Sequence, residues 1–211
     1  MKTSAKTRDR LVSVAAQLFY TEGITACGVD KVVREAGITK PTLYSHYRSK
    51  AELVAAALTF QHQTRRRMIE DYLGQRQEET AEQRILAVFD WLETWSSQQG
   101  SRGCAFLNAS VELVGVQDDS ARQIIRQHKE WWQTLLADLA REAGVAEPDR
   151  LADELLILID GVNARVLVTG QAKSAQSARR IAGLLLEESS RIRSSACPPG
   201  LRAGDLEDPD V

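Results

Sequence analysis

The sequence predicts an all-α fold in two parts, a small N-terminal unit over residues 1–50 and a larger helical unit over residues 51–195. Three observations support it: apolar residues recur at spacings of three and four, glycines separate these segments, and no segment shows the alternation of a half-buried strand. Residues 196–211 are rich in Pro, Gly and Asp, so we expect a disordered tail.

Three helices are predicted in the N-terminal unit. The first ends at Gly23 and carries one apolar stripe, formed by Leu11, Val14, Ala15, Leu18 and Phe19. The second is short, begins near Val29 and ends at Gly37. Thr39 is a suitable N-cap and Pro41 suits a first helical turn, so a third helix should begin near Lys40 and end before Ser49.

Similar signals predict the helices of the larger unit. Ser49-x-x-Glu52 has the pattern of a capping box and should open a long helix that runs to about Leu73. Thr80-x-x-Gln83 should open another, which closes at Gly100. Further helices are expected over 105–114, from Asp118 or Asp119 to Gly144, over 148–170, and from Ser174 or Ser177 to about Arg193.

The charge is unevenly distributed along a chain of ordinary composition. Of 211 residues, 43% are hydrophobic and 27% charged, values typical of a folded globular protein. Residues 1–50 carry nine Lys/Arg and four Asp/Glu (+5), which leaves 18 and 25 (−7) for the remainder. The N-terminal unit is therefore the part suited to a polyanion.

The cysteines and the apolar runs indicate the cellular compartment in which the protein is expected. Cys27, Cys104 and Cys197 are odd in number and widely spaced, so neither a disulfide framework nor a zinc site is indicated. The first residues lack the apolar core of a secretory signal, and the apolar run Leu155–Ile159, like every other, is far below the roughly 20 residues of a membrane span. We expect a soluble cytoplasmic protein without a metal or other cofactor.

The helices around Gly37 have the spacing of a helix-turn-helix, whose second helix enters the major groove of DNA. Leu43 and Tyr47 share the face that should pack on Val32 and Val33. The outward set is Lys40, Pro41, Thr42, Tyr44, Ser45 and His46. Lys40 could reach guanine, Pro41 and Thr42 a thymine methyl, and Tyr44, His46 and Lys50 phosphates. The alternative is a solvated helix corner in which Tyr44 and His46 pack or cap.

The segment AGITKPTLYSHYRSKAEL, residues 36–53, resembles the DNA-binding signature of the TetR/AcrR family of bacterial one-component regulators. The resemblance implies a three-helix helix-turn-helix DNA-binding domain followed by a larger helical ligand-binding and dimerisation domain. It implies that Lys40, Pro41, Thr42, Tyr44, His46 and Lys50 contact an operator. Two positions depart from the family: Tyr47 replaces a preferred Phe, and Gly28 replaces a Thr that commonly caps the second helix. A glycine N-cap costs only about a few tenths of a kcal/mol.

The segment over 151–170 is apolar around too much of its circumference for a helix with one solvated face. With its partner helix over 177–192 it is the expected homodimer surface, formed by Leu155, Ile159, Gly161, Val162, Val166, Ile181, Leu184 and Leu185. The pattern fits a helix central to its own subunit equally well, and the family resemblance favours the dimer.

Aromatic residues concentrate in the middle helices, where all four Trp lie between residues 91 and 132. They suggest a pocket for a small apolar or aromatic effector, lined by Trp91, Trp95, Cys104, Phe106, Asn108, Glu112, His128, Trp131 and Trp132. The alternative is that the aromatic residues pack in the hydrophobic core and that Asn108 and Glu112 hydrogen-bond to a loop or to solvent. The segment RGCAFLNASVEL, residues 102–113, is similar to one in a subset of the same family, which identifies no effector.

A repressor released from a palindromic operator by a small molecule is the expected function, and activation remains an alternative. A helical protein-interaction module is a second alternative. A third is a redox or electrophile sensor through Cys104, which follows Gly103 at a predicted helix start beside Arg102. With three His, no nucleophile elbow, no phosphate-binding loop and no paired metal ligands, the sequence carries no catalytic constellation, so no enzyme is expected.

Overall fold

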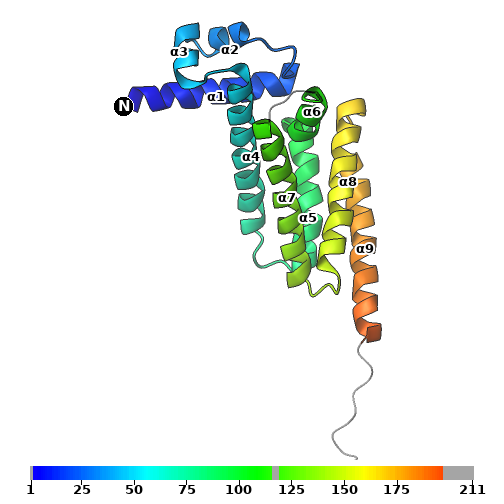
Figure 1. Ribbon diagram of the computed structural model, residues 1–211. Coiled ribbons are helices and arrows are strands. Elements are labelled where there is room, and N and C mark those ends of the chain that lie inside the picture. Colours follow the sequence, from blue (N-terminus) through cyan, green and yellow to red (C-terminus); the bar gives the residue numbers. More distant parts are fainter. Residues whose placement is uncertain (1, 116–118, 197–211) are drawn as a thin grey trace, which may run out of the picture.

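Helices run side by side through most of the chain in the computed structural model, which describes residues 2–115 and 119–196 (Figure 1). This described part contains nine helices and no strand, as the periodicity predicts. They are α1 (Lys2–Glu22), α2 (Val29–Glu35), α3 (Lys40–His46), α4 (Lys50–Gly74), α5 (Ala81–Gln98), α6 (Ala105–Glu112), α7 (Asp119–Glu142), α8 (Pro148–Thr169) and α9 (Ser174–Ala196).

The small unit of α1–α3 lies across one end of the longer helices (Figure 1). The local signals that predicted α3 are confirmed: Thr39 is its N-cap, its Oγ1 accepts from the Thr42 N–H at 3.4 Å, and Pro41 lies in the first turn. Gly28 caps α2 without a side-chain hydrogen bond. Gly37 reverses the chain between α2 and α3 with a φ of +61°, a conformation that a side chain would strain.

One of the two predicted capping boxes forms completely. Thr80 Oγ1 accepts from the Gln83 N–H at 3.2 Å, and Gln83 Oε1 accepts from the Thr80 N–H at 2.8 Å. Ser49 Oγ accepts from the Glu52 N–H at 3.1 Å, which confirms that cap, but the return bond differs. Glu52 Oε2 accepts from the Arg48 N–H at 2.6 Å, so its carboxylate holds the residue before the cap.

Two buried clusters form the core. The first joins α1–α3, the beginning of α4 and part of α6, and in it Leu43 is 0% and Tyr47 5% exposed, as their shared face predicts. The second joins the end of α4 with α5, α7, α8 and α9. The first cluster continues along α4 to Leu58, so α4 serves both clusters, and the domain boundary at residue 50 stays a prediction.

Several helix ends differ from expectation. α6 ends at Glu112 rather than Val114, because the chain turns toward Gly115, whose φ is +81°. α9 continues to Ala196, the first residue of the predicted tail. The rest of that tail, Cys197 within it, and the alternative cap Asp118 lie outside the described residues.

Candidate nucleic-acid interface and buried cavity

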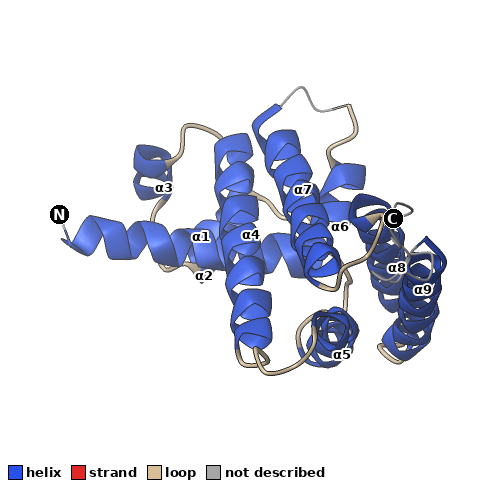
Figure 2. Cartoon of the chain, turned by 90° about the horizontal axis from the view of Figure 1, so that it is seen from below, coloured by secondary structure: helices blue, strands red, loops and turns tan. Residues whose placement is uncertain are grey.

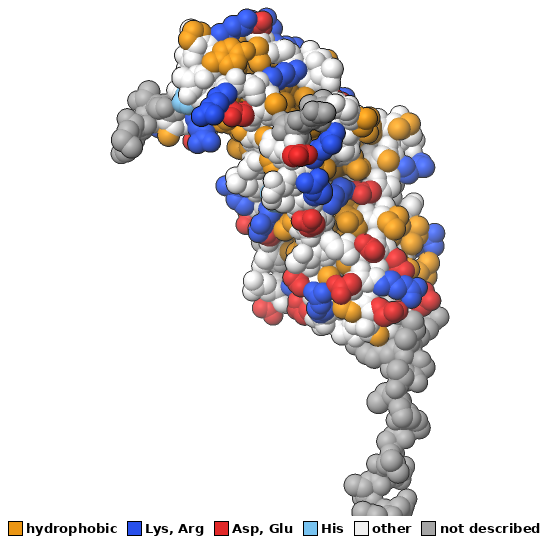
Figure 3. Space-filling model, in the orientation of Figure 1, with side chains coloured by type: hydrophobic (Ala, Val, Ile, Leu, Met, Phe, Trp, Pro, Cys, Tyr) orange, Lys and Arg blue, Asp and Glu red, His pale blue; other side chains and the backbone are white. Residues whose placement is uncertain are grey.

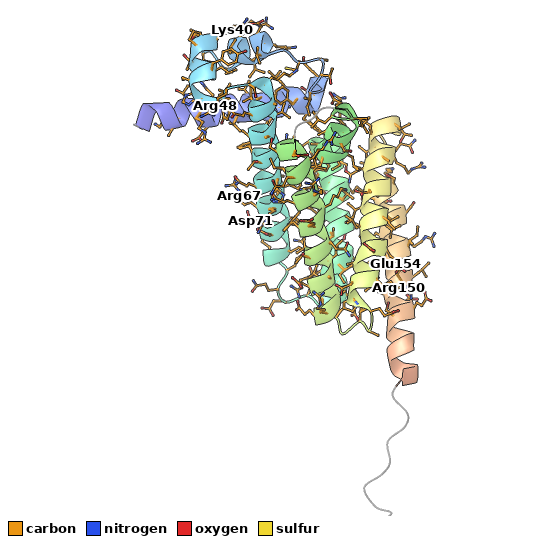
Figure 4. The ribbon with its side chains drawn as sticks, viewed as in Figure 1. Lys40, Arg48, Arg67, Asp71, Arg150 and Glu154 are labelled. Carbon is orange, nitrogen blue, oxygen red and sulfur yellow. The ribbon has the colours of Figure 1, made fainter. Side chains whose placement is uncertain are left out.

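The outer face of α3 carries the residues that the sequence assigned to DNA. Lys40, Pro41, Tyr44 and Ser45 are exposed, whereas Thr42 and His46 are half-buried. Tyr44 has an exposed fraction of 46%, so its ring is not a packing group of the helix corner. Figure 4 places Lys40 at the top of the molecule, in the unit of α1–α3, and Arg48 below it. Lys50 is half-buried in the first turn of α4.

Part of this polar face already has partners within the chain. Lys40 Nζ lies 2.7 Å from Asp30 Oδ1 on α2, an exposed ion pair that water weakens. The hydroxyls of Thr39 and Thr42 are 2.9 Å apart, and Ser45 Oγ donates to the Thr42 carbonyl at 2.7 Å. Lys40 can therefore contact DNA only after its ion pair with Asp30 breaks. Tyr44 has no hydrogen bond or ion pair to break among the described residues.

The hydroxyl of Tyr47, at the position that departs from the family's Phe, has its own partner. Arg8 Nε on α1 donates to Tyr47 Oη at 3.2 Å, and this bond raises the pKa of Arg8. The departure at Tyr47 thus adds a link between α1 and the end of α3. Lys and Arg side chains are prominent around this end of the molecule in Figure 3, in keeping with the charge of residues 1–50.

α6 is bonded to the helix-turn-helix unit at both of its ends. Before α6, Tyr20 Oη donates to the Gly103 carbonyl and accepts from the Arg102 N–H, both at 3.0 Å. At its last residue, Glu112 Oε2 accepts from the backbone N–H of Thr25 at 2.8 Å. These hydrogen bonds connect the two ends of α6 to α1 and to the segment that joins α1 to α2.

Two predicted effector residues belong to this joint. Asn108 Nδ2 donates to the Arg102 carbonyl at 2.9 Å, and Glu112 is held by Thr25. Both line a separate hollow of about 20 Å³ between α1, α4 and α6. In the single chain both side chains hold loops, the alternative that their one-turn spacing left open, and their contact with an effector stays a prediction.

A cavity of about 30 Å³ lies among α4–α8, large enough for a water-sized molecule. Six of the nine predicted pocket residues line it: Trp91, Trp95, Cys104, Phe106, His128 and Trp132. Trp131 is outside the lining and packs edge-on against His62, with ring centroids 6.0 Å apart. Cys104 is the half-buried N-cap of α6 and makes no capping bond with its side chain. A ligand larger than a water molecule can enter only if these side chains move.

The cavity also contains Arg65, which the sequence analysis missed. Its Cζ lies 3.6 Å from the centroid of the Trp95 ring and 5.5 Å from that of Trp91. The residue as a whole is half-buried, but its Nη1 is closed off from solvent and has no hydrogen-bond partner in the described chain. Burial lowers the pKa of Arg65 to about 10, so the guanidinium stays charged at neutral pH.

A periodicity signal for Arg65 was present in the sequence. It is the first of three consecutive arginines, a run that reads as a solvated face, yet it lies seven residues after Leu58 and four before Ile69. Those two residues are 5% and 0% exposed. Helical spacing therefore puts Arg65 on the buried stripe of α4.

The other basic groups around the cavity are neutral or paired. Lys129 forms an ion pair with Asp160. Burial, with the nearby positive groups, lowers the pKa of His128 to about 2, and burial also lowers the pKa of His62, whose Nδ1 lies 3.2 Å from Nδ1 of His128. Both imidazoles are therefore neutral at pH 7, and Arg65 carries the unbalanced charge of this cavity.

α8 and α9 form one edge of the molecule in both views of the chain (Figures 1 and 2). Four residues assigned to a dimer surface are buried by their own subunit: Leu155, Ile159, Val162 and Val166, at 0–3% exposure. The reason is that they form the stripe of α8 in the second buried cluster. Leu185 is half-buried.

The exposed apolar residues of this edge follow a second stripe. They are Ile157 (70%), Leu167 (45%) and Val168 (81%) on α8, and Ile181 (38%) and Leu184 (51%) on α9. Gly161 is exposed between them, and hydrophobic side chains are visible along this edge in Figure 3. Gly161, Ile181 and Leu184 of the predicted surface are thus available to a partner, whereas the four buried residues of α8 are not, and the dimer surface itself stays a prediction.

Two features are absent from the described residues. None of their helices combines the length and the hydropathy required to cross a membrane. Nor do their His, Cys, Asp and Glu side chains form a group of three or more that could hold a metal ion.

Comparisons with known proteins match both parts of the chain. Residues 11–57 match the family model "Bacterial regulatory proteins, tetR family", and residues 81–182 match "Tetracyclin repressor-like, C-terminal domain". The chain is 41% identical over 51 residues to the HTH-type transcriptional activator FasR of Mycolicibacterium smegmatis, which is 24% of this chain and 23% of FasR. The first curated relatives are matched over less than half of their length, from 23% to 45%.

Longer matches cover most of both chains. The uncharacterised HTH-type transcriptional regulator YdgC of Bacillus subtilis is 26% identical over 187 residues, 86% of this chain and 91% of YdgC. Among solved structures, the TetR-family transcriptional regulator SCO4454 of Streptomyces coelicolor has a TM-score of 0.79 and 26% identity. That match covers 88% of this chain and 97% of SCO4454.

Proposed function

Because this chain belongs to the TetR family of bacterial transcriptional regulators, we propose that it binds a palindromic operator as a homodimer and releases it when a small molecule binds. The observation that carries the proposal is the exposed face of α3, with Tyr44 at its centre. Membership of this family argues against a protein-interaction module that does not bind DNA. We propose no catalytic reaction for the chain. A cytoplasmic location follows from the proposed function, because the operator is there.

Each outward residue of α3 receives a role that its chemistry permits. Lys40 reads guanine O6 and N7, whereas Tyr44, His46 and Lys50 donate to phosphates. Pro41 and the Thr42 methyl contact thymine, a role compatible with the bond between the Thr42 and Thr39 hydroxyls. Ser45 adds a polar contact near the backbone of the DNA.

The homodimer is proposed to form through the exposed apolar edge of α8 and α9. Ile157, Val168 and Leu184 are large side chains exposed to water in the single chain. An isologous contact of two helices from each subunit buries all of them. It also gives two recognition helices, which must lie about one DNA turn, 34 to 36 Å, apart to read adjacent half-sites.

Release is proposed to work through α6, because this helix contacts both the cavity and the helix-turn-helix unit. Cys104 and Phe106 line the cavity, and Glu112 is bonded to Thr25. A molecule that fits only an opened cavity favours a displaced α6. The dimer population then shifts toward a spacing of the recognition helices that the operator does not accept.

Selection from a random duplex pool tests the proposal, followed by fluorescence anisotropy at several salt concentrations. We expect an inverted repeat to be enriched, and Tyr44→Ala to lose affinity for it. Gln127→Ala, an exposed change on α7, is the control and should bind as wild type does. If no inverted repeat is enriched, the proposed function as an operator-binding regulator is wrong. Because FasR is named an activator, a reporter gene should be read for both gain and loss of expression.

A further inference from the structure

Arg65 has the surroundings of a ligand-binding group rather than of a structural ion pair. Its Nη1 is buried and lacks a hydrogen-bond partner in the described part of the chain. A buried cation is unfavourable unless an anion or a set of acceptors compensates the lost hydration. No carboxylate of the described residues forms an ion pair with it, so this part of the chain provides no anion to compensate the charge.

The guanidinium is oriented by its aromatic neighbours. With Cζ 3.6 Å from the ring centroid, it stacks on the indole of Trp95, which is itself stacked on Trp91 at 6.0 Å between ring centroids. Stacking engages the face of a guanidinium and leaves its N–H groups for acceptors near its own plane. A carboxylate matches that fork with two parallel hydrogen bonds.

The net charge of the cavity lining favours a ligand with a single negative charge. Lys129 is neutralised by Asp160, and His128 and His62 are uncharged at neutral pH. The single positive charge of Arg65 therefore suits a monoanion better than a phosphate, which carries more charge. The remaining walls are mostly apolar and aromatic, and include Phe106 and Trp132.

We propose that the effector of this regulator is a small organic carboxylic acid, bound with its carboxylate on Arg65 and its apolar body among Trp91, Phe106 and Trp132. The effect on DNA rests on the proposed function, whereas binding itself does not. The cavity opens to admit the acid, since its present volume of about 30 Å³ holds only a water-sized molecule. Opening moves Phe106, and with it α6.

The test is a titration of the full-length protein with benzoate, phenylacetate and octanoate, each paired with its neutral amide, by calorimetry and tryptophan fluorescence. At least one acid should bind to wild type about tenfold or more tighter than its amide. Arg65→Gln should abolish that preference. Arg67→Gln removes the same charge two residues away, from an exposed position on the outer side of α4 (Figure 4), and should retain it.

Three results would overturn the proposal: no acid binds, the amides bind as tightly as the acids, or Arg65→Gln keeps the preference. If Arg65→Gln fails to fold, the comparison of acid with amide on wild type still decides. Operator binding is measured separately. If an acid binds but does not release the operator, the carboxylate site is confirmed and its role in induction is contradicted. If an acid binds but no operator is found, only the proposed function as a DNA-binding regulator is contradicted.

Discussion

Glu112, the last residue of α6, accepts a hydrogen bond from the backbone N–H of Thr25, which lies between α1 and α2, at 2.8 Å. Its carboxylate also closes over Gly23, where an added Cβ would lie 3.0 Å from Oε2. Together with the bonds of Tyr20 to Arg102 and Gly103, this contact ties a cavity-lining helix to the DNA-binding unit at two points.

Removing the Glu112 contact should uncouple the two parts. Glu112→Ala leaves the Thr25 N–H to water and should lower the free energy of unfolding by about 1 kcal/mol. Operator affinity without effector should persist, but more effector should be needed for release. Urea unfolding and anisotropy titrations measure both. Glu130→Ala, an exposed change on α7, is the control, and an unchanged effector requirement in Glu112→Ala would contradict transmission through this bond.

Gly103 should tolerate no side chain. Its φ is +64°, and an added Cβ would lie 2.3 Å from the Asn163 carbonyl oxygen, a backbone atom of α8 that cannot turn aside. Gly103→Ala combines a left-handed strain of about 1–2 kcal/mol with this overlap, so a loss of about 3 kcal/mol or more is expected in urea unfolding. Gly74→Ala meets open space at the end of α4 and should change stability by less than about 0.5 kcal/mol.

The roles of two lysines should separate in DNA binding. Lys40→Ala should relax specificity at one base pair, with a loss of roughly tenfold to a hundredfold on the operator only. Lys50→Ala should weaken binding to all sequences and reduce the salt slope by about one. Anisotropy on operator and scrambled duplexes over a salt series distinguishes them. Equal losses of both variants on both duplexes would undo these assignments.

A charge on the exposed stripe of α8 should separate the subunits. Ile157 is 70% exposed in the single chain, so Ile157→Asp should leave the fold intact while placing two carboxylates in the proposed contact. Light scattering after gel filtration should report a monomer, and operator affinity should fall with it. Val111→Asp makes the same kind of change at 73% exposure on α6 and should stay dimeric. A dimeric Ile157→Asp would exclude this stripe.

Stability should fall in mild acid because of His128. Its pKa is lowered to about 2 by burial, so below about pH 6.5 the unfolded chain takes up a proton that the folded chain refuses. The stability lost is about 1.4 kcal/mol per pH unit, so about 2 kcal/mol between pH 6.5 and pH 5. His128→Gln should remove the His128 share of this slope in urea unfolding and leave the smaller share of His62, whose pKa burial also lowers. A wild-type stability that does not change over that interval would contradict a neutral His128.

Local signals were readable from the sequence because their partners lie within a few residues. Thr39 and the Thr80–Gln83 pair cap their helices as predicted, and the spacing of Leu43 and Tyr47 identified the buried face of α3. The half-formed box at Ser49 shows the limit of such signals, since Glu52 has a choice of two backbone N–H groups and holds that of Arg48.

The sequence alone thus determined the helices, the helix-turn-helix and its outward face, because periodicity and caps act within one helix. Only the tertiary structure decided which of two apolar stripes of α8 is covered, since Leu155 and Ile157 look alike in a pattern and differ only in their neighbours. Tertiary contacts also placed Asn108 and Glu112 at the joint between the two parts, and Arg65 inside the cavity. A residue's burial and pairing depend on elements brought together from distant parts of the chain.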